Sequence, residues 1–345
     1  MIAIHNSKSG FHPAWIAYCQ EQGIPFKLVN CLDDDIIGQL KDVRALLWHH
    51  SHMLPKDLIA AKPILAALSH QGFPVFPDCR TNWHFDDKLA QKYLLESLEL
   101  PMVKTFAFYD PKDALSWARQ TKYPTVHKLK TGSGSSQVRL VGNYHGAKKI
   151  ILKSFGKGFS NYAPFNSLKE RIYQFKNGHA PWMSIVKGLL RFVHYPEYAT
   201  VQGRERGYVL FQEFVPNNPS DIRVIVIGNK AFAITRWVRK DDFRASGSGH
   251  FSHDPDLIPL SCLESAFKAN QKLKGQCIAF DFVMDEKQTP RIIEISYGFS
   301  PEAFRHCPGH WDQHLHWQEG RFVPEHWMVE ALLKDLVVTG ASDPK

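Results

Sequence analysis

The chain has 345 residues, of which 44% are hydrophobic and 22% charged, an ordinary composition for a globular protein that excludes a disordered or fibrous chain. This length is sufficient for two or three domains with large buried cores. Lysine and arginine outnumber aspartate and glutamate by 42 to 34, which gives a formal net charge of +8. No recognisable nucleic-acid-binding motif accompanies this charge, so a nucleic-acid partner is not expected.

The cysteines and the first residues indicate the cellular compartment. The six cysteines are dispersed and include no CxxC pair, so we expect reduced thiols. The opening MIAIHNS reads as a buried strand and lacks the basic segment and apolar run of a secretion signal. No apolar stretch approaches membrane-spanning length. These features predict a cytoplasmic protein.

In the first eighty residues, short apolar runs alternate with helix-like stretches. We expect strands at residues 2–4, 26–29, 44–48 and 74–76, separated by helices such as 13–22 and 55–71. This alternation predicts a small parallel α/β sheet, and the absence of a GxGxxG turn gives no support to dinucleotide binding. His49, His50 and His52 follow a predicted strand. We interpret them as a polar loop rather than a ligand site, because no carboxylate or cysteine completes a metal set.

Residues 81–152 contain a lysine at a helix start and a second lysine before a glycine/serine loop. Two aspartates precede Lys88, and the following LAQKYLLESL predicts a helix with Leu89, Tyr93 and Leu94 on its buried face. After a strand-like PMVKTFAFY and a helix near 111–121, a strand carrying Lys128 enters the loop Gly132–Ser136, and a strand at 138–141 leaves it. Main-chain amides of such a loop can fold over phosphates. A flexible hairpin tip is the alternative.

The following segment, residues 153–207, is called the basic insertion below. From Lys153 to Arg206 it carries nine lysines and arginines against three glutamates, a balance of +6. Its apolar residues at helical spacing are Trp182, Ile185, Val186, Leu189, Leu190 and Val193. We interpret this stripe as a helix face docked on the protein's own core. The alternative is a basic amphipathic element that meets an anionic substrate or a membrane surface.

Polar residues then follow along predicted strands: Gln212, Glu213, Asp221, Arg223, Arg236, Arg239 and Arg244. In the alternating segment DIRVIVIG, Ile222 and Val224 would face one side of the strand, so that Asp221 and Arg223 share the other side. Surface ion pairs would explain any one of these arginines. Four arginines close before a carboxylate hairpin favour a site for phosphate and carboxylate groups.

The segment CIAFDFVMDEKQTPRIIEIS places Asp281 and Glu294 inside apolar strands joined by a polar turn. An uncompensated buried carboxylate is costly, so this placement calls for a cation. Glu294 and Ser296 share one face of their strand, and hairpin pairing can bring Asp281 opposite them. Such oxygen ligands suit Mg²⁺ better than zinc. The alternative is an amphipathic hairpin with its acids in solvent.

The order of these motifs resembles the ATP-grasp superfamily, most closely its ribosomal-protein glutamate ligases, glutathione synthetases and D-alanine:D-alanine ligases. The resemblance covers about residues 81–305. It implies an α/β and α+β protein, in which a small N-terminal parallel α/β domain (1–80) precedes a two-subdomain ATP-grasp fold (81–335) with the nucleotide between the subdomains. The basic insertion would interrupt this fold, and residues 336–345 would form a C-terminal tail.

The resemblance also implies roles for individual residues. Lys88 and Lys128 would contact the phosphates of ATP, and Arg223 and Arg244, with Arg236 as a further candidate, would hold the phosphate and the activated carboxylate. The nucleotide loop would be Gly132, Ser133, Gly134, Ser135 and Ser136, the adenine edge would meet Gln212, Glu213, Phe214 and Val215, and the ribose would lie near Asp221. Asp281 and Glu294 would ligate Mg²⁺. Ser296 stands where the family usually has asparagine, which puts a second metal ion in doubt.

The activity implied is an ATP- and Mg²⁺-dependent carboxylate–amine ligase that forms an amide through an acylphosphate and uses no protein nucleophile. The expected partners are a small-molecule or glycan carboxylate and an amine, with a homo-oligomer expected and a peripheral membrane contact through the basic insertion left open. The aromatic segment 296–322 has a composition able to stack on sugar rings, although a packed segment explains it equally well. It also resembles the tails of ATP-grasp proteins from cell-surface polysaccharide pathways, and that resemblance implies a polysaccharide precursor as the substrate. The alternatives are an inactive nucleotide-binding protein that docks on an anionic surface and an ATP-grasp kinase without ligation.

Overall fold

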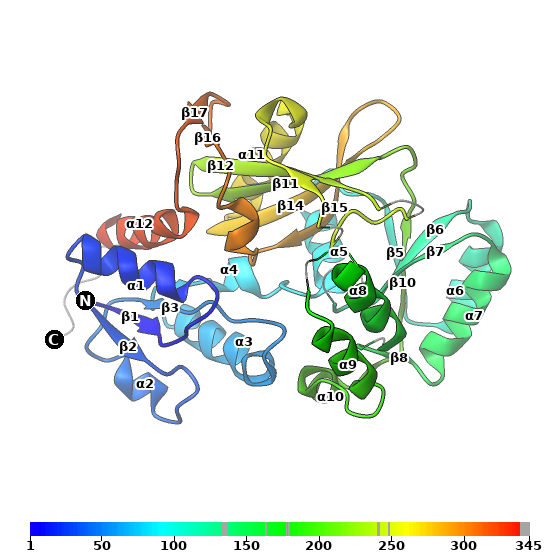
Figure 1. Cartoon of the computed structure of the whole chain (residues 1–345), viewed down its shortest axis with the longest axis horizontal. Helices are drawn as coiled ribbons and strands as arrows, with labels where there is room; N and C mark the ends of the chain where they lie inside the picture. Colours follow the sequence, from blue (N-terminus) through cyan, green and yellow to red (C-terminus); the bar gives the residue numbers. More distant parts are fainter. Residues whose placement is uncertain are drawn as a thin grey trace. The chain divides into compact units, whose positions relative to one another are not determined.

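The structure is a computed structural model that describes residues 1–132, 137–162, 164–176, 178, 180–239, 242–247 and 249–338. The chain forms two compact units (Figure 1). The first unit comprises Met1–Phe85, Tyr93–Met102 and Asn217–Lys345, and the second comprises Asp86–Lys92 and Val103–Pro216. Helix α5 (Lys88–Ser97) contributes to both units. The domain boundaries at residues 80, 152, 207 and 335 stay predictions. Within the described ranges, no helix combines the length and apolar character needed to span a membrane.

The first unit begins with a four-stranded parallel sheet of order β2-β1-β3-β4, as the alternating sequence predicted. Its elements are β1 (Ile2–His5), α1 (His12–Glu21), β2 (Phe26–Val29), α2 (Ile36–Gln39), β3 (Leu46–Leu47), α3 (Pro55–His70), β4 (Val75–Phe76) and α4 (Cys79–Asn82). The central strands are apolar because both faces of this sheet are covered, by core clusters around Trp15 and around Trp48.

The same unit contains a seven-stranded sheet with the path β15-β14-β11-β12-β16-β17, and β13 pairs with β12. All of its pairs are antiparallel. The strands are β11 (Ser220–Ile227), β12 (Lys230–Trp237), β13 (Phe251–Ser252), β14 (Cys277–Met284), β15 (Pro290–Ser296), β16 (Gly309–Asp312) and β17 (Trp317–Glu319). The other elements of this part are the helices α11 (Leu260–Leu273) and α12 (Pro324–Val338) and the 3-10 turns η1 (Pro255–Leu257) and η2 (Pro301–Phe304).

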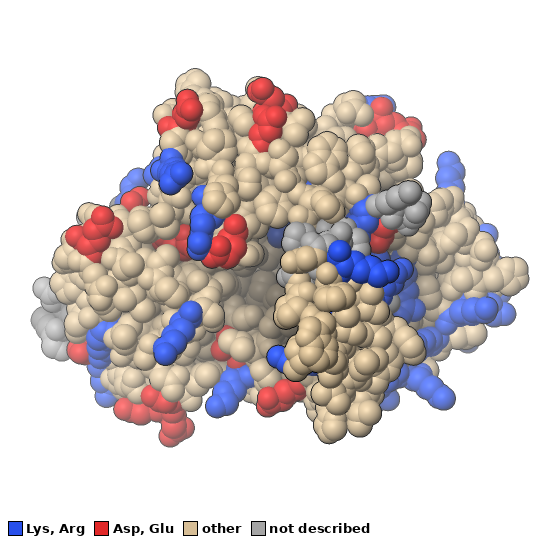
Figure 2. All heavy atoms as spheres, viewed as in Figure 1, with Lys and Arg blue, Asp and Glu red and all other residues tan. Residues whose placement is uncertain are grey.

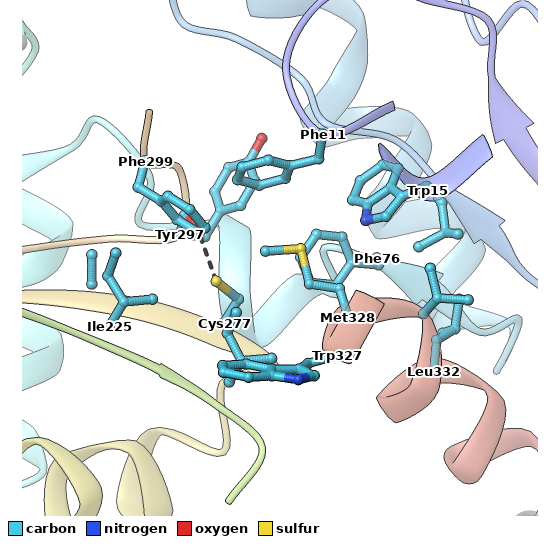
Figure 3. Close-up of a cluster of buried hydrophobic side chains, with 14 of the residues drawn as sticks. Phe11, Trp15, Phe76, Ile225, Cys277, Tyr297, Phe299, Trp327, Met328 and Leu332 are labelled. Atoms are coloured by element: carbon cyan, nitrogen blue, oxygen red, sulfur yellow. Dashed lines mark hydrogen bonds between the residues drawn. The ribbon is translucent and has the colours of Figure 1, made fainter. Parts of the chain in front are cut away.

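The two faces of this sheet follow the alternation of its strands. Val224 and Phe280 belong to a core that includes residues of α11. Ile225 and Cys277 belong to a different core, which they share with Trp15 of α1 and with residues of α12 (Figure 3). Asp221, Arg223 and Asp281 have the same parity as Ile225 and Cys277, so the polar residues continue an otherwise apolar face.

The second unit is built on a four-stranded antiparallel sheet of order β5-β10-β6-β7. Its elements are β5 (Thr105–Phe108), α6 (Pro111–Gln120), β6 (Thr125–Lys128), β7 (Val138–Val141), α7 (Tyr144–Phe155) and β10 (Val209–Glu213). The helices α6 and α7 supply Ala114, Ala118, Ala147 and Ile151 to a core with Phe211 of the central strand. The predicted strand at 138–141 is confirmed.

The basic insertion folds as a small helical segment of the second unit, with β8 (Phe159–Ser160), α8 (Pro164–Lys176), α9 (Met183–Leu190), α10 (Glu197–Gln202) and β9 (Arg204–Glu205). β8 and β9 pair with each other. The interpretation of its apolar stripe as a face docked on the core is wrong for most of the stripe. Trp182, Val186, Leu189, Leu190 and Val193 are exposed, and only Ile185 is half-buried.

Two further sequence interpretations need correction. Tyr93 is not on the buried face of α5: it is 45% exposed, and the helix instead buries Lys88, Gln91, Lys92 and Leu95. His50 is not in a polar loop, because it is buried with its ring 5.0 Å from Tyr297 and 5.4 Å from Phe85. Apolar periodicity missed both cases, since it does not register polar side chains that are buried by their neighbours.

Candidate active site

Four charged residues meet on three neighbouring strands of the seven-stranded sheet. The strand register pairs Asp221 of β11 with Arg236 of β12, and Arg223 of β11 with Asp281 of β14. Arg223 donates from Nε and Nη2 to the two oxygens of Asp281 at 2.6 and 2.7 Å. Arg236 donates to Asp221 in the same way, at 2.6 and 2.7 Å. We call these four residues the strand cluster.

Arg236 joins the two ion pairs, because its Nη2 also lies 2.9 Å from Oδ2 of Asp281. Asp281, Asp221 and Arg236 are all buried, which makes the desolvation of each charge costly unless it is paired. Burial alone would raise the pKa of Asp281, but the guanidinium groups of Arg223 and Arg236 hold it well below its usual value. Asp281 is therefore an anion at neutral pH. For Asp221 burial prevails over the attraction of Arg236, and its pKa is raised.

The cation that compensates Asp281 in this structure is thus a pair of arginines, whereas the sequence suggested a metal ion. Asp281 has enough acceptor positions to bind the two arginines and a metal ion together. Asp281 accepts three hydrogen bonds, and a carboxylate offers about four acceptor positions. On the other side of β14, the register pairs Asp281 directly with Glu294 of β15, as the predicted hairpin required. Two adjacent carboxylates fit Mg²⁺, which proteins commonly hold through one or two carboxylates together with phosphate and water.

Ser296 fits a third ligand position less well. Its register partner on β14 is Ala279 rather than Asp281. Its hydroxyl donates to the carbonyl of Gly298 at 2.9 Å and accepts from the amide of the same residue at 3.2 Å. Over the described part of the chain, no group of three or more His, Cys, Asp or Glu side chains is arranged to hold a metal ion.

The predicted phosphate-binding lysines lie in the second unit, where Lys88 is tied to the start of the glycine/serine loop. The amide of Lys88 donates to the carbonyl of Lys130 at 2.8 Å, and its Nζ donates to the carbonyl of Gly132, also at 2.8 Å. The amide of Gly132 in turn donates to Asp86 at 2.8 Å. Gly132 has a φ of +110°, which favours glycine there. Residues 133–136 of the predicted loop lie outside the described residues.

Lys128 and the predicted adenine-binding segment lie on adjacent strands of the second unit. Lys128 at the end of β6 is buried and pairs with Leu210 of β10, and Gln212 pairs with Val126. Gln212 donates from its side-chain amide to the Thr105 hydroxyl at 3.0 Å, and the amide of Glu213 donates to the carbonyl of Lys104 at 2.9 Å. Phe214 and Val215 follow the strand end.

The last predicted arginine, Arg244, lies in the segment after β12 rather than on the strands of the cluster. It donates from Nη2 to Asp242 at 2.7 Å. Burial alone would raise the pKa of the Asp242 carboxyl, but the Arg244 guanidinium lowers it below its usual value. Its predicted contact with phosphate stays a prediction.

Sequence reasoning missed Glu205, which had been counted only as one charge of the basic insertion. Glu205 is buried at the end of β9, and its carboxylate accepts hydrogen bonds from the amides of Lys130 and Thr131 at 2.9 and 3.0 Å. It also accepts from the hydroxyl groups of Thr131 and Tyr208. Glu205 therefore anchors the chain that leads from β6 into the glycine/serine loop. Between Arg204 and Arg206 in the sequence, it carries no signal that distinguishes a buried acid from any other charge of the insertion.

Comparison with known proteins gives the fold. No family model matches the chain. The chain is 21% identical over 225 residues to the alpha-aminoadipate–LysW ligase LysX of Saccharolobus solfataricus, a match that spans 65% of this chain and 66% of that protein. Two solved structures are similar over 96% of the chain. One is an ATP-grasp RimK domain protein of Sphaerobacter thermophilus, covered completely, with a TM-score of 0.54 and 17% identity.

The other is the biotin carboxylase domain of a Hydrogenobacter thermophilus 2-oxoglutarate carboxylase in complex with MgADP, of which 69% is covered, with a TM-score of 0.59 and 13% identity. These likenesses agree with the arrangement of the two units, each taken by itself: a parallel α/β sheet and a large antiparallel sheet in one, and a four-stranded antiparallel sheet in the other. The chain therefore has the ATP-grasp fold that the order of its motifs predicted.

Proposed function

We propose that the protein is an ATP- and Mg²⁺-dependent carboxylate–amine ligase that activates its acid substrate as an acylphosphate. The observation that carries this proposal is the strand cluster beside Glu294: two arginines and an aspartate that is ionised at neutral pH, next to a second carboxylate. The fold supports it, since the LysX relative is named as a ligase and a structural neighbour holds MgADP.

The arginines account for the first half of the reaction. A carboxylate at neutral pH is a poor electrophile, and transfer of the γ-phosphoryl group of ATP to one of its oxygens gives an acylphosphate and ADP. Arg223 is the more accessible of the two clustered guanidiniums, with 21% of its side chain exposed against 9% for Arg236. Arg223 would therefore meet the transferring phosphoryl group, where a planar cation stabilises the charge on the equatorial oxygens. Arg236 would keep Asp281 and Asp221 in place.

Asp281 and Glu294 would hold the metal ion, which neutralises phosphate charge and aligns the phosphates when bound. Lys88 and Lys128 would bind the phosphates of ATP, and the strand end at Gln212–Val215 would meet the adenine. Attack of an amine on the acylphosphate carbon then forms the amide and releases phosphate, so that no protein nucleophile is consumed.

The substrate class is proposed only as a carboxylic acid and an amine. A glycan carboxylate of a cell-surface precursor is one candidate acid, suggested by the aromatic segment 296–322. Part of that segment is packed inside the protein: Trp311 is buried, and its ring lies 4.6 Å from that of Trp317. This burial favours a structural role for these two rings over sugar stacking.

An ADP-release screen tests the proposal. The full-length protein is incubated with Mg·ATP and with pairs of acids and amines that include amino acids and uronic-acid sugars. Ligation requires ADP release that depends on both partners, with an amide product detected by mass spectrometry. ADP release with an acid alone, without an amide product, would instead identify a kinase. ATP binding without ADP release for every acid–amine pair would identify an inactive binding protein.

A further inference from the structure

The basic insertion presents an apolar surface to solvent. On α9, its N-cap residue and the turn that follows, Trp182 is 61% exposed, Leu189 54%, Leu190 60% and Val193 79%. Met183 and Val186 are exposed on the same helix. The spacing of three, four and seven residues puts these side chains on one face of the helix, and that face is the one turned to water. We call it the α9 face.

The opposite side of α9 packs against α8, so the orientation of the helix is determined by contacts. Gly188 is buried, and a Cβ added to it would lie 2.8 Å from the side chain of Arg171 on α8. Arg171 donates from Nη1 to the carbonyl of Ser184 at 3.1 Å. The ring of Phe192, after α9, lies 4.8 Å from that of Phe165 at the start of α8. The α9 face is therefore the outer side of a packed pair of helices and not the result of an unpacked helix.

The segment that carries the α9 face is rich in positive charge. The segment Lys153–Arg206 carries +6 of the formal net charge of +8. Lys187 is exposed beside the apolar face, and Lys169 and Lys176 are exposed on α8. Figure 2 shows the α8–α10 segment with a largely uncharged surface and with lysine and arginine side chains along its edges. An apolar face within a cationic segment, with a tryptophan at its N-terminal end, has the composition of helices that lie in the interface of an anionic bilayer.

We propose that the α9 face docks the protein on an anionic membrane surface, with the apolar side chains inserted among the acyl chains and the lysines against the headgroups. Attraction of the +6 segment to anionic lipid, and insertion of exposed apolar area, both favour this occupant. A second copy of the chain would bring the same positive segment against itself, and the two segments would repel each other. Docking goes beyond the proposed ligase activity and does not depend on it.

Vesicle sedimentation tests the proposal on the full chain. We expect binding to vesicles of phosphatidylcholine with about one third phosphatidylglycerol, little binding to phosphatidylcholine alone, and weakening as salt rises to about 0.15 M. The double variant Leu189→Ser/Leu190→Ser should lose at least about tenfold in affinity, since it removes inserted apolar area. Lys187→Glu should weaken binding by roughly tenfold through the headgroup attraction alone.

Matched controls separate docking from general effects. Ile59 and Leu260 are similarly exposed, at 63% and 56%, and lie in the first unit, so Ile59→Ser/Leu260→Ser should bind vesicles like the wild type. Lys148→Glu on α7 is the control for charge. Thermal melting of each variant establishes that it is folded, and emission from Trp182, isolated by comparison with Trp182→Phe, should shift to the blue on vesicle binding.

The outcomes are decisive in both directions. Binding to anionic vesicles that the α9 variants lose and the controls keep would establish the docking face. Absence of vesicle binding, or equal binding by the α9 double variant and the wild type, would overturn the proposal. If sedimentation equilibrium shows a dimer that the α9 double variant abolishes, while vesicles bind none of the proteins, the occupant is a second copy and the membrane assignment is wrong.

Discussion

Arg223 and Asp281 lie directly opposite each other on β11 and β14 and are joined by two hydrogen bonds of 2.6 and 2.7 Å. The pair uses the planar fork of the guanidinium, which matches the two oxygens of a carboxylate. The pair also holds the side chain of Arg223 in place, because its partner Asp281 is buried. The Arg223 side chain itself keeps 21% exposure. Arg223 is thus a positioned cation with a part that a ligand can reach.

Replacing Arg223 by lysine should lower turnover by roughly tenfold or more, because lysine keeps the charge and loses the fork. The measurement is the rate of ADP release at saturating ATP. Arg291→Lys is the matched control: Arg291 on β15 also pairs with an aspartate, Asp285 at 2.9 Å, yet it lies outside the strand cluster. Normal turnover of the Arg223 variant would transfer the role to Arg236 or Arg244.

Glu294→Gln should abolish metal-dependent turnover with little change in melting temperature, since Glu294 is only half-buried. Titration of Mg²⁺ at fixed ATP is the measurement, and a variant with an unchanged Mg²⁺ dependence would remove Glu294 from the metal site.

Asp281→Asn should lose turnover and stability together. It leaves the buried Arg236 with one carboxylate partner fewer, and breaking a buried pair costs about 3–5 kcal/mol. The sequence had suggested that removing either carboxylate would leave the fold largely intact. The structure restricts that expectation to Glu294, because the partners of Asp281 are cations inside the protein. An Asp281→Asn protein that melts like the wild type would show that the cluster contributes little to folding.

The strand cluster illustrates how far the sequence could go. Period-two alternation was enough to put Asp221 and Arg223 on one face, and hairpin pairing allowed Asp281 to lie opposite Glu294, since both inferences use only neighbouring stretches of the chain. Sequence reasoning could not identify the arginine partners of Asp281. Arg236 on β12 reaches Asp281 on β14 across the intervening strand β11, and the register of these three strands depends on tertiary packing. Glu205 was missed for the same reason, because its partners Lys130 and Thr131 are more than seventy residues away.

Periodicity also identified the apolar stripe of α9 but assigned its environment wrongly. Leu189 and Leu190 follow the same spacing whether a helix face meets a core or meets water. The contacts with α8, among them the close approach of Arg171 to Gly188, decide which side of the helix is inside. The charge balance of the segment favoured the alternative of an exposed face, and what that face meets stays a proposal.

Glu205→Gln should raise the KM for ATP by roughly tenfold with a smaller effect on kcat, because one charge-assisted acceptor of the Lys130 and Thr131 amides is lost. Glu205 would then be a positioning residue for the chain that enters the glycine/serine loop. Glu264→Gln, at an exposed pair with Lys268, is the control. A lower melting temperature with an unchanged KM would reduce Glu205 to a structural role.

Buried histidines should make the protein sensitive to mild acid. Burial lowers the pKa of His12 from 6.5 to about 4, and the pKa values of His50 and His127 to about 3. Between those values and about 6.5 the unfolded chain binds protons that the folded chain does not, so the free energy of unfolding falls as pH drops through this window. His127 is the clearest test, since it lies in the core of the second unit with its ring 5.7 Å from Phe211.

His127→Leu should therefore reduce the pH dependence of unfolding between about pH 6.5 and pH 4 by up to about one proton. The measurement is the denaturant-derived free energy of unfolding at each pH. His145→Leu, at an exposed position on α7, is the control that should leave the slope unchanged. Some buried carboxylates act in the opposite direction, because burial raises the pKa of Asp57 and Glu325 and their protonation favours the folded state. The comparison of slopes between variant and wild type cancels that contribution. Equal slopes would mean that burial does not lower the pKa of His127 in the folded protein.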